Sequence, residues 1–231
     1  MGRTFAVSDI HGNWDIWKAI KNKLKPDDIL YILGDCADRG DRGWDIIKEA
    51  INHPQVIYLK GNHEDMLAKA IREVEQYEYC GDCYRLLAHN GGTTTFNAWS
   101  NDGSYYEWAN VLNKLPTTAT YKNIKGDHIF LSHAGYTPIY FAYKPDEEDL
   151  IWSREHFLDE WPEDPYLQNV YIIHGHTPIP YLAEDIARRD CRFDEPFWYC
   201  NNHKCCIDNL TIFTKSTVLL DLDTFEYIVI E

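Results

Sequence analysis

The chain carries little positive charge for its length. Of its 231 residues, 22 are Lys or Arg and 37 are Asp or Glu, so the formal net charge is −15. Proteins that bind long nucleic acids need a cationic face to displace counterions from the phosphate backbone. No apolar run approaches the roughly 18 residues of a membrane-spanning helix. We therefore expect neither a long nucleic acid nor a membrane as a partner.

An apolar export signal is missing as well. The N-terminal residues enter a strand-like segment directly, without the apolar stretch of a signal peptide. The seven cysteines are an odd number. In a mid-sized chain without an export signal we interpret them as thiols or metal ligands rather than as a disulfide framework. The expected location is cytoplasmic, and the sequence does not indicate an oligomeric state.

The composition is that of a folded protein, since 45% of the residues are hydrophobic and 14% are aromatic. The first part of the chain repeats one arrangement. A short β-rich run is followed by a loop rich in Gly and Asp, and then by apolar residues at helical spacing. The predicted strands are residues 4–7, 29–33 and 56–59. Each is nearly continuous in apolar character, as strands covered on both faces are.

The remainder of the chain predicts a helical insertion and a second sheet. Residues 75–115 turn polar and aromatic, and we expect helices at 83–89 and 93–99 on either side of a Gly-rich break. A hairpin that turns at Lys125-Gly126 begins the second sheet. Because no linker is visible, residues 1–231 are expected to form a single domain. Further strands are predicted at 170–173, 218–222 and 225–230, the last two joined at Asp223-Thr224.

Five loops that follow predicted strands hold most of the side chains able to do chemistry. The first three span residues 8–12, 34–40 and 61–64, about one βα unit apart, so they should emerge side by side at the carboxyl edge of one sheet. Two later loops, 131–135 and 173–177, also follow strands and add histidines. The convergent candidates are Asp9, His11, Asp35, Asn62, His133 and His176.

This mixture of oxygen and imidazole ligands suits Mn, Fe, Zn or Ni, whereas an all-oxygen site is typical of Ca²⁺ and Mg²⁺. Asp35 is central by loop order. A carboxylate so placed can bridge two ions about 3.5–4 Å apart, the geometry that clamps the attacking and leaving oxygens in phosphoryl transfer. Turn chemistry alone explains the Gly, Asp and Asn residues of one such loop, but it does not explain five.

The five loops read SDIHG, GDCADRG, GNHE, HAG and HGHT, between residues 8 and 177. In this order they resemble the signatures of the phosphoprotein-phosphatase family of calcineurin-like metallophosphoesterases. The segments 90–92 (Asn-Gly-Gly) and 152–155 (Trp-Ser-Arg-Glu) resemble its compact bacterial and phage-type branch of serine/threonine protein phosphatases. Ser8 and Lys60 depart from the family pattern, where Gly and often Arg stand. The resemblance implies an α/β fold, a two-sheet β-sandwich flanked by helices.

The resemblance also implies two divalent metal ions. Mn²⁺ is the expected metal, with Fe, Zn and Ni as alternatives. Metal coordination lowers the pKa of bound water towards about 7, so a metal-bridging hydroxide would attack phosphorus directly, without a phosphoenzyme. The implied ligands are Asp9, His11 and Asp35 for the first ion, and Asp35, Asn62, His133 and His176 for the second.

The same resemblance implies roles for neighbouring residues. His63 would be the general acid that protonates the leaving oxygen, with Asp38 orienting its imidazole and stabilising its cation. Arg39 and Arg154 would grip the phosphate oxygens, because a guanidinium offers a planar fork that matches them. Asn62 would contact the phosphate as well.

The expected function is hydrolysis of phosphoserine and phosphothreonine in a phosphorylated protein or peptide. The alternatives are a symmetrical diadenosine-tetraphosphate hydrolase, a nucleotide phosphodiesterase and, without catalysis, a metal-bound scaffold. Cations expected around the site are few: Arg39, Lys60 and Arg154, with Arg42 as a further candidate. A chain of net charge −15 should repel a polyphosphate more than a singly phosphorylated peptide, which favours the peptide.

Some residues outside this cluster carry weaker expectations. The segment 80–83 (Cys-Gly-Asp-Cys) has zinc-knuckle spacing, and later cysteines could complete a structural zinc site, although free thiols are the simpler interpretation. Cys36 is expected to be a small packed thiol, and His174 a core or supporting residue. The acidic run 146–149 is the expected start of a helix, where carboxylates are favoured.

Overall fold

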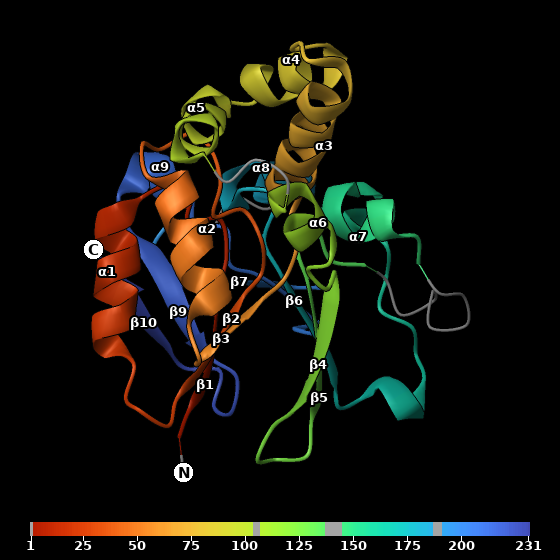
Figure 1. Cartoon of the computed structure of the whole chain (residues 1–231). Helices are drawn as coiled ribbons and strands as arrows, with labels where there is room; N and C mark the ends of the chain where they lie inside the picture. The colour runs from red at the N-terminus through yellow and green to blue at the C-terminus, as the bar shows by residue number, and fades with distance from the viewer. Residues whose placement is uncertain (1, 104–106, 137–144, 187–190) are drawn as a thin grey trace.

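Two five-stranded β-sheets face each other, and helices cover them from outside (Figure 1). The computed structural model describes residues 2–103, 107–136, 145–186 and 191–231. Both sheets mix parallel and antiparallel pairs. The α/β sandwich flanked by helices that the sequence predicts is therefore confirmed.

The first sheet contains the three strands predicted from the N-terminal βα units. Its strand order is β10 (Tyr227–Ile230), β9 (Thr217–Asp221), β1 (Thr4–Val7), β2 (Ile29–Ile32) and β3 (Val56–Tyr58). The last three run parallel to one another. Parallel neighbours need crossover connections, usually helices. As a result, the loops after β1, β2 and β3 all emerge at the same edge.

The second sheet has two antiparallel edge strands around a parallel centre. Its order is β4 (Thr118–Lys122), β5 (His128–Ser132), β6 (Val170–His174), β8 (Lys204–Cys206) and β7 (Phe197–Tyr199). The predicted hairpin is present between β4 and β5. Its turn contains Gly126 at φ +92°, a left-handed conformation that favours glycine.

Helices with one apolar face cover the sheets. In Figure 1, α1 (Trp14–Lys23) and α2 (Gly43–Asn52) lie over the first sheet, and α4 (Asp82–His89) and α5 (Thr93–Asp102) lie at the top of the molecule beside the end of α3 (Asn62–Tyr77). The described part of the segment predicted as an insertion thus contains the end of α3 and three further helices. The helices are α1 (Trp14–Lys23), α2 (Gly43–Asn52), α3 (Asn62–Tyr77), α4 (Asp82–His89), α5 (Thr93–Asp102), α6 (Trp108–Asn113), α7 (Glu147–Trp152), α8 (Ile179–Asp185) and α9 (Thr211–Thr214), with the 3₁₀ turns η2 (Glu155–Leu158) and η3 (Pro165–Leu167).

The apolar core has two main layers. Between the sheets, Leu33, Leu131 and Leu220 are fully buried. Between the first sheet and its helices, Trp17 and Trp44 are almost fully buried. Removing such surface from water contributes roughly 25 cal/mol per Å² of apolar area. These layers hold the strand ends, and with them the loops, in fixed positions.

The structure corrects some predicted strands. Phe225 lies in a turn at φ +62°, so the last strand begins at Tyr227 rather than at residue 225. The carboxylate of Asp221 accepts hydrogen bonds from the N–H groups of Asp223 and Thr224 (2.9 and 3.2 Å), which stabilises this turn. Strands β7 and β8 were not predicted: each has three residues, and β8 begins with a lysine, a residue type seldom buried.

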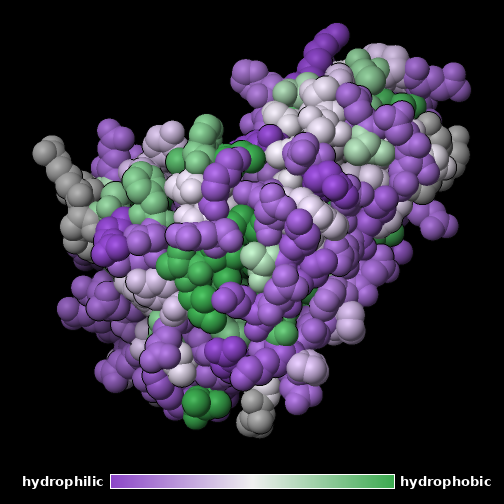
Figure 2. All heavy atoms as spheres, turned by 90° about the vertical axis from the view of Figure 1, so that its left-hand side faces the viewer, coloured by the Kyte–Doolittle hydropathy of each residue, from purple (hydrophilic) through white to green (hydrophobic). Residues whose placement is uncertain are grey.

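Figure 2 shows one face, on the side of α1 and β10, with hydrophilic side chains around a central apolar patch. Among the described helices, none is both long enough and apolar enough to cross a membrane.

Candidate active site

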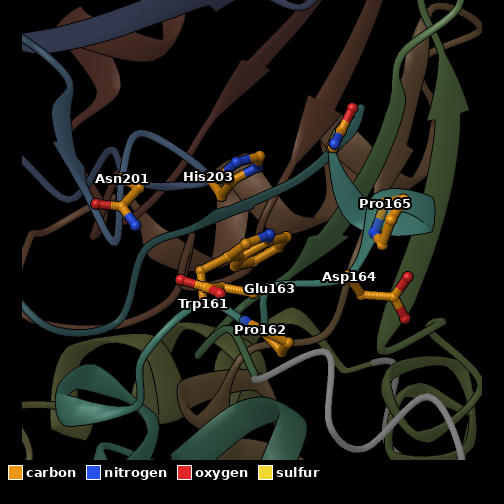
Figure 3. A pocket seen from close by; sticks show the side chains of 8 residues that line it. Trp161, Pro162, Glu163, Asp164, Pro165, Asn201 and His203 are labelled. Atoms are coloured by element: carbon orange, nitrogen blue, oxygen red, sulfur yellow. The ribbon is translucent and has the colours of Figure 1, made fainter.

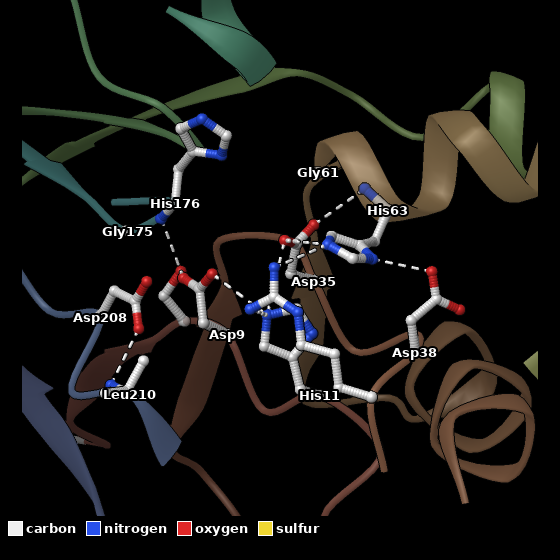
Figure 4. A network of polar contacts seen from close by, with 12 residues as sticks. Asp9, His11, Asp35, Asp38, Gly61, His63, Gly175, His176, Asp208 and Leu210 are labelled. Carbon is white, nitrogen blue, oxygen red and sulfur yellow. Dashed lines mark hydrogen bonds and ion pairs between the residues drawn. The ribbon is translucent and has the colours of Figure 1, made fainter. Parts of the chain in front are cut away.

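The polar loops of the two sheets meet at the carboxyl ends of their strands (Figure 4). Asp9 follows β1, Asp35 follows β2, and Asn62 begins α3 just after β3. From the second sheet, His133 follows β5 and His176 follows β6. The structure therefore brings together the six residues that the sequence nominates as ligands. All six are buried, with exposed fractions of at most 7%: Asp9, His11, Asp35, Asn62, His133 and His176.

Several of these side chains sit on strained backbone. The φ angle is +55° at Asp9, +47° at His11, +56° at Asp35 and +66° at His176. Residues other than glycine rarely adopt this left-handed conformation, and it costs on the order of 1–3 kcal/mol per residue. Such strain persists where the surrounding structure imposes it, and it concentrates at functional sites.

Asp35 lies at the centre of the cluster. It belongs to two groups of potential metal ligands whose ligand atoms lie within 4.8 Å of one another: one with Asp9 and His133, the other with His11 and His63. Its Oδ2 lies 3.4 Å from Nε2 of His133 and 3.8 Å from Nε2 of His11. A carboxylate shared by two groups is placed as a bridging ligand would be.

Backbone carbonyls orient the imidazoles of the three histidines among these candidates. Each ring donates a hydrogen bond from one nitrogen, which directs the other nitrogen, the potential metal-binding atom, into the site. The bonds run from His11 Nδ1 to Ala37 O (2.9 Å), from His133 Nδ1 to Leu33 O (2.6 Å) and from His176 Nε2 to Trp152 O (3.2 Å). The inward nitrogens of His133 and His176 lie 2.9 and 3.0 Å from Oδ1 of Asn62. Nε2 of His133, Nδ1 of His176 and Oδ1 of Asn62 thus lie close enough together to bind one ion.

The electrostatics of this pocket favour a positive charge. Burial by itself raises the pKa of Asp35, but the neighbouring His133 and His63 outweigh it and hold that pKa well below its ordinary value. Burial lowers the pKa of His133, but Asp35 and Asp9 outweigh it and raise that pKa to about 10. Buried carboxylates need a compensating cation. The donor set and its charge therefore fit divalent metal ions.

His63 differs from the other histidines in its outer partner. Its Nδ1 donates to Oδ2 of Asp38 over 2.7 Å, and both side chains are fully buried. Burial lowers the pKa of His63, but Asp35 and Asp38 raise it above its ordinary value. The pKa of His11, whose outer partner is a neutral carbonyl, lies well below its ordinary value because of burial and the nearby His63 and Arg39. His63 is thus the better proton carrier of the two.

Two exposed arginines stand over the cluster. The Nη1 and Nη2 atoms of Arg39 donate to Nε2 of His11 (2.8 Å) and Nε2 of His63 (3.1 Å). The Nε atom of Arg154 donates to Oγ1 of Thr177 over 3.1 Å. Both arginines line one pocket together with His176. The predicted phosphate-binding arginines therefore lie at the mouth of the candidate metal site.

Glu64 supports the site in a way that the sequence analysis did not predict. Its fully buried carboxylate accepts five hydrogen bonds of 2.8–3.1 Å. Four come from backbone N–H groups of Asp35, Cys36, Ala37 and Gly61, and one from the hydroxyl of Tyr58. Burial and the charge of Asp35 raise the pKa of Glu64 above its ordinary value, although these hydrogen bonds lower it. Glu64 therefore ties the loop of Asp35 to the start of α3.

Asp208 is a second buried carboxylate that sequence reasoning missed. It follows β8 at the same edge of the second sheet, and Figure 4 shows it beside Asp9. Burial and the charge of Asp9 raise its pKa well above the ordinary value. Like the predicted ligands, Asp208 lies in a loop that follows a strand. A prediction of β8 would therefore have identified it by the same pattern.

Other expectations have mixed outcomes. Lys60 does not turn toward the site, because its ammonium pairs with Glu147 and donates to the carbonyl of Asn113. Arg42 pairs with Asp45 instead. Over the described ranges, the groups of closely spaced metal ligands contain no cysteine, so the structural zinc finds no support. Cys36 and His174 are both fully buried, as expected, and the acidic run does begin a helix, α7.

A separate hollow lies away from this centre. It has a volume of about 330 Å³, and Trp161 and His203 stack in it with ring centroids 4.4 Å apart (Figure 3). The residues that line it include none of the predicted site residues. The predicted site residues thus lie at the strand ends and not in this hollow.

A known protein family matches most of the chain. The family model for calcineurin-like phosphoesterases matches residues 2–205, a range that contains every candidate ligand. A search of curated proteins finds no match.

Solved structures share the fold at low sequence identity. A candidate diadenosine tetraphosphatase has a TM-score of 0.61 at 16% identity, over 99% of this chain and 93% of that one. A cold-active protein tyrosine phosphatase has a TM-score of 0.61 at 17% identity, over 99% and 77%. A protein serine/threonine phosphatase from Saccharomyces cerevisiae has a TM-score of 0.57 at 14% identity, over 99% and 78%. These likenesses show the shared fold.

Proposed function

This chain belongs to the calcineurin-like phosphoesterase family, and from that premise we propose that it removes phosphate from phosphoserine and phosphothreonine in proteins. The family implies a metal-dependent hydrolase. One observation carries the proposal: two groups of buried ligands share Asp35, and two exposed arginines line the pocket above them. This arrangement suits a phosphate monoester, whose charge is concentrated on one phosphoryl group.

The ligands divide between two divalent ions. When bound, such ions act as Lewis acids on a phosphoryl oxygen and lower the pKa of bound water to about 7. The share of imidazole favours Mn²⁺, with Fe, Zn and Ni as alternatives. We assign Asp9, His11 and Asp35 to one ion, and Asp35, Asn62, His133 and His176 to the other. The two groups of closely spaced ligand atoms instead pair Asp9 with His133 and His11 with His63. Oδ1 of Asp9 also lies 3.7 Å from Nε2 of His11, which supports placing these two on one ion.

The remaining residues bind the substrate and move the proton. Arg39 and Arg154 hold the phosphate oxygens in bidentate fashion, with Asn62 beside them. Once Arg39 turns to the phosphate, Nε2 of His63 no longer accepts the hydrogen bond of Arg39. It can then take up a proton and give it to the leaving oxygen. Asp38 keeps the ring in position and stabilises its cationic form through Nδ1.

The charges around the pocket favour a monoester over a polyphosphate. Lys60 and Arg42, expected near the site from the sequence, are paired with Glu147 and Asp45. A dinucleotide polyphosphate carries several further phosphates that need cations. In a chain of net charge −15, these phosphates are repelled more than a singly phosphorylated peptide is.

A substrate panel on metal-loaded protein tests the proposal. We expect a chelator to abolish hydrolysis of an aryl phosphate, and Mn²⁺ to restore it better than Mg²⁺. We also expect kcat/KM for a phosphoserine peptide to exceed that for diadenosine tetraphosphate at two salt concentrations. Asp35→Asn should abolish hydrolysis of the aryl phosphate and of the phosphoserine peptide. Asp15→Asn, at a side chain 90% exposed, should change neither.

The runner-up is a diadenosine-tetraphosphate hydrolase, favoured by the likeness to a candidate diadenosine tetraphosphatase that covers 93% of that chain. Tenfold or greater preference for the dinucleotide at both salt concentrations would establish this runner-up and reject the phosphatase. Metal binding without hydrolysis of any phosphate ester would instead support the non-enzymatic alternative, a metal-bound scaffold.

A further inference from the structure

A pocket opens beside the two arginines of the candidate active site. Its volume is about 370 Å³, and Arg39, Arg154 and His176 are among the residues that line it. Thr177, which accepts the hydrogen bond from Arg154, lines it too. The pocket is therefore continuous with the place where a phosphate would bind.

Two large aromatic side chains form much of the outer wall. Tyr181 comes from α8 and Phe213 from α9, and 58% and 76% of their surfaces are exposed. Pro178 and Leu210 also line the pocket. Single exposed apolar residues are ordinary, but apolar residues gathered around a concavity mark a binding surface. This wall would bury apolar surface of a ligand.

One buried residue holds the two aromatic helices in a fixed relation. The carbonyl of Asp208 accepts from the N–H of Ile179 at the start of α8, and its side chain accepts from the N–H of Leu210 just before α9, both over 3.0 Å. Because both helices are attached to the same buried residue, the wall is formed before a ligand arrives. A pre-formed wall lowers the ordering cost of binding.

We infer that this pocket binds an apolar side chain of the substrate peptide, adjacent to the phosphorylated residue. The inference rests on the proposed phosphatase function. The arginines hold the phosphate at one end, so the neighbouring peptide residue meets the aromatic wall. A second phosphate in the same place would meet the carboxylate of Asp185, which also lines the pocket. Like charges disfavour that ligand.

Phosphoserine peptides that differ at one flanking position test the inference. The flanking residue is Leu or Glu, placed before or after the phosphoserine, and the protein is loaded with Mn²⁺. We expect kcat/KM to be about tenfold higher for the better Leu peptide than for its Glu counterpart, because part of an apolar side chain is buried.

Variants of the wall show whether the pocket sets this preference. Phe213→Ala, alone or with Tyr181→Ala, should lower the Leu-to-Glu ratio of kcat/KM towards one. Phe213→Asp should shift the preference from Leu toward Lys. The matched control is Tyr166→Ala, which removes an aromatic side chain that is 91% exposed and does not line the pocket. It should keep the ratio of the parent protein.

The possible outcomes distinguish a failure of this inference from a failure of the proposed phosphatase function. Equal turnover of Leu and Glu peptides by the parent protein, or an unchanged ratio in the wall variants, would overturn the inference and leave the phosphatase standing. Hydrolysis of an aryl phosphate without turnover of any peptide would overturn both. Faster hydrolysis of diadenosine tetraphosphate that falls in Phe213→Ala would assign the pocket to a nucleobase and overturn the inference as well.

Discussion

Glu64→Gln is the substitution that best tests how the site is held together. The two side chains have nearly the same shape, but Gln keeps only one acceptor oxygen and replaces the other with an NH₂ group. In the native protein, Oε2 accepts from the N–H groups of Asp35 and Gly61 (2.8 and 3.0 Å). Oε1 accepts from Cys36, Ala37 and the Tyr58 hydroxyl.

Whichever way the amide turns, two backbone N–H groups lose their acceptor. If the NH₂ group replaces Oε2, these are the N–H groups of Asp35 and Gly61. If it replaces Oε1, they are those of Cys36 and Ala37, while the Tyr58 hydroxyl can rotate. A buried donor left unpaired costs about 1–3 kcal/mol, so the expected loss in the free energy of unfolding is about 2–6 kcal/mol. That is a large share of the roughly 5–15 kcal/mol typical of a domain.

The same change should weaken metal binding, because the freed loop carries Asp35. Partners that orient metal ligands typically contribute about 10- to 100-fold in affinity. The free energy of unfolding is measured by urea titration of metal-free protein, and Mn²⁺ affinity by calorimetry. Glu64→Ala would leave all five donors unpaired, and we expect it not to fold.

Glu73→Gln is the matched control. The Glu73 carboxylate also accepts from backbone N–H groups, those of Gly81, Cys83 and Tyr84 over 2.8–3.1 Å, but it lies at the junction of α3 and α4. It is only half-buried, so water can replace lost partners. We expect a small loss of stability and unchanged Mn²⁺ affinity. If Glu64→Gln leaves the free energy of unfolding within about 0.5 kcal/mol of the parent value and the Mn²⁺ affinity unchanged, then Glu64 does not organise the site.

Three further predictions concern charge and proton transfer. Asp35→Asn should release both metal ions and Asp9→Asn chiefly one, since Asp35 is shared; equal metal contents by elemental analysis would contradict the bridging role. His63→Asn should lower kcat by about 10²–10⁴ with both ions retained, and less for p-nitrophenyl phosphate, whose leaving group needs no proton. A uniform loss would mean that His63 only positions the substrate. Asp38→Asn should be milder, and the double variant non-additive. Burial lowers the pKa of Lys204 from 10.5 to about 8. Between these values the unfolded chain binds more protons, so stability should rise with pH by about 3 kcal/mol. Lys204→Met should lack this rise in urea titrations from pH 7 to 11.

Local patterns predict much of the scaffold because strand propensity and turn chemistry act over a few residues. The predicted runs 4–7, 29–33 and 56–59 correspond to β1, β2 and β3, with ends that differ by at most one residue. The loops after them contain the candidate ligands, as expected from strand order. By contrast, β8 has three residues and begins with Lys204, a residue type seldom buried. Asp208, which follows it, was missed for that reason.

The sequence by itself determined which residue types follow which strands, and hence the two βα crossovers and the set of candidate metal ligands. Only the tertiary structure decided what each polar side chain meets. His133 and Asp35 come from different sheets, and Lys60 pairs with Glu147 across 87 positions of the chain. Glu64 collects five donors from three segments. Such partnerships depend on how the two sheets and their helices pack. They join residues far apart in the sequence, and the local hydrophobic periodicity gives no information about contacts of that range.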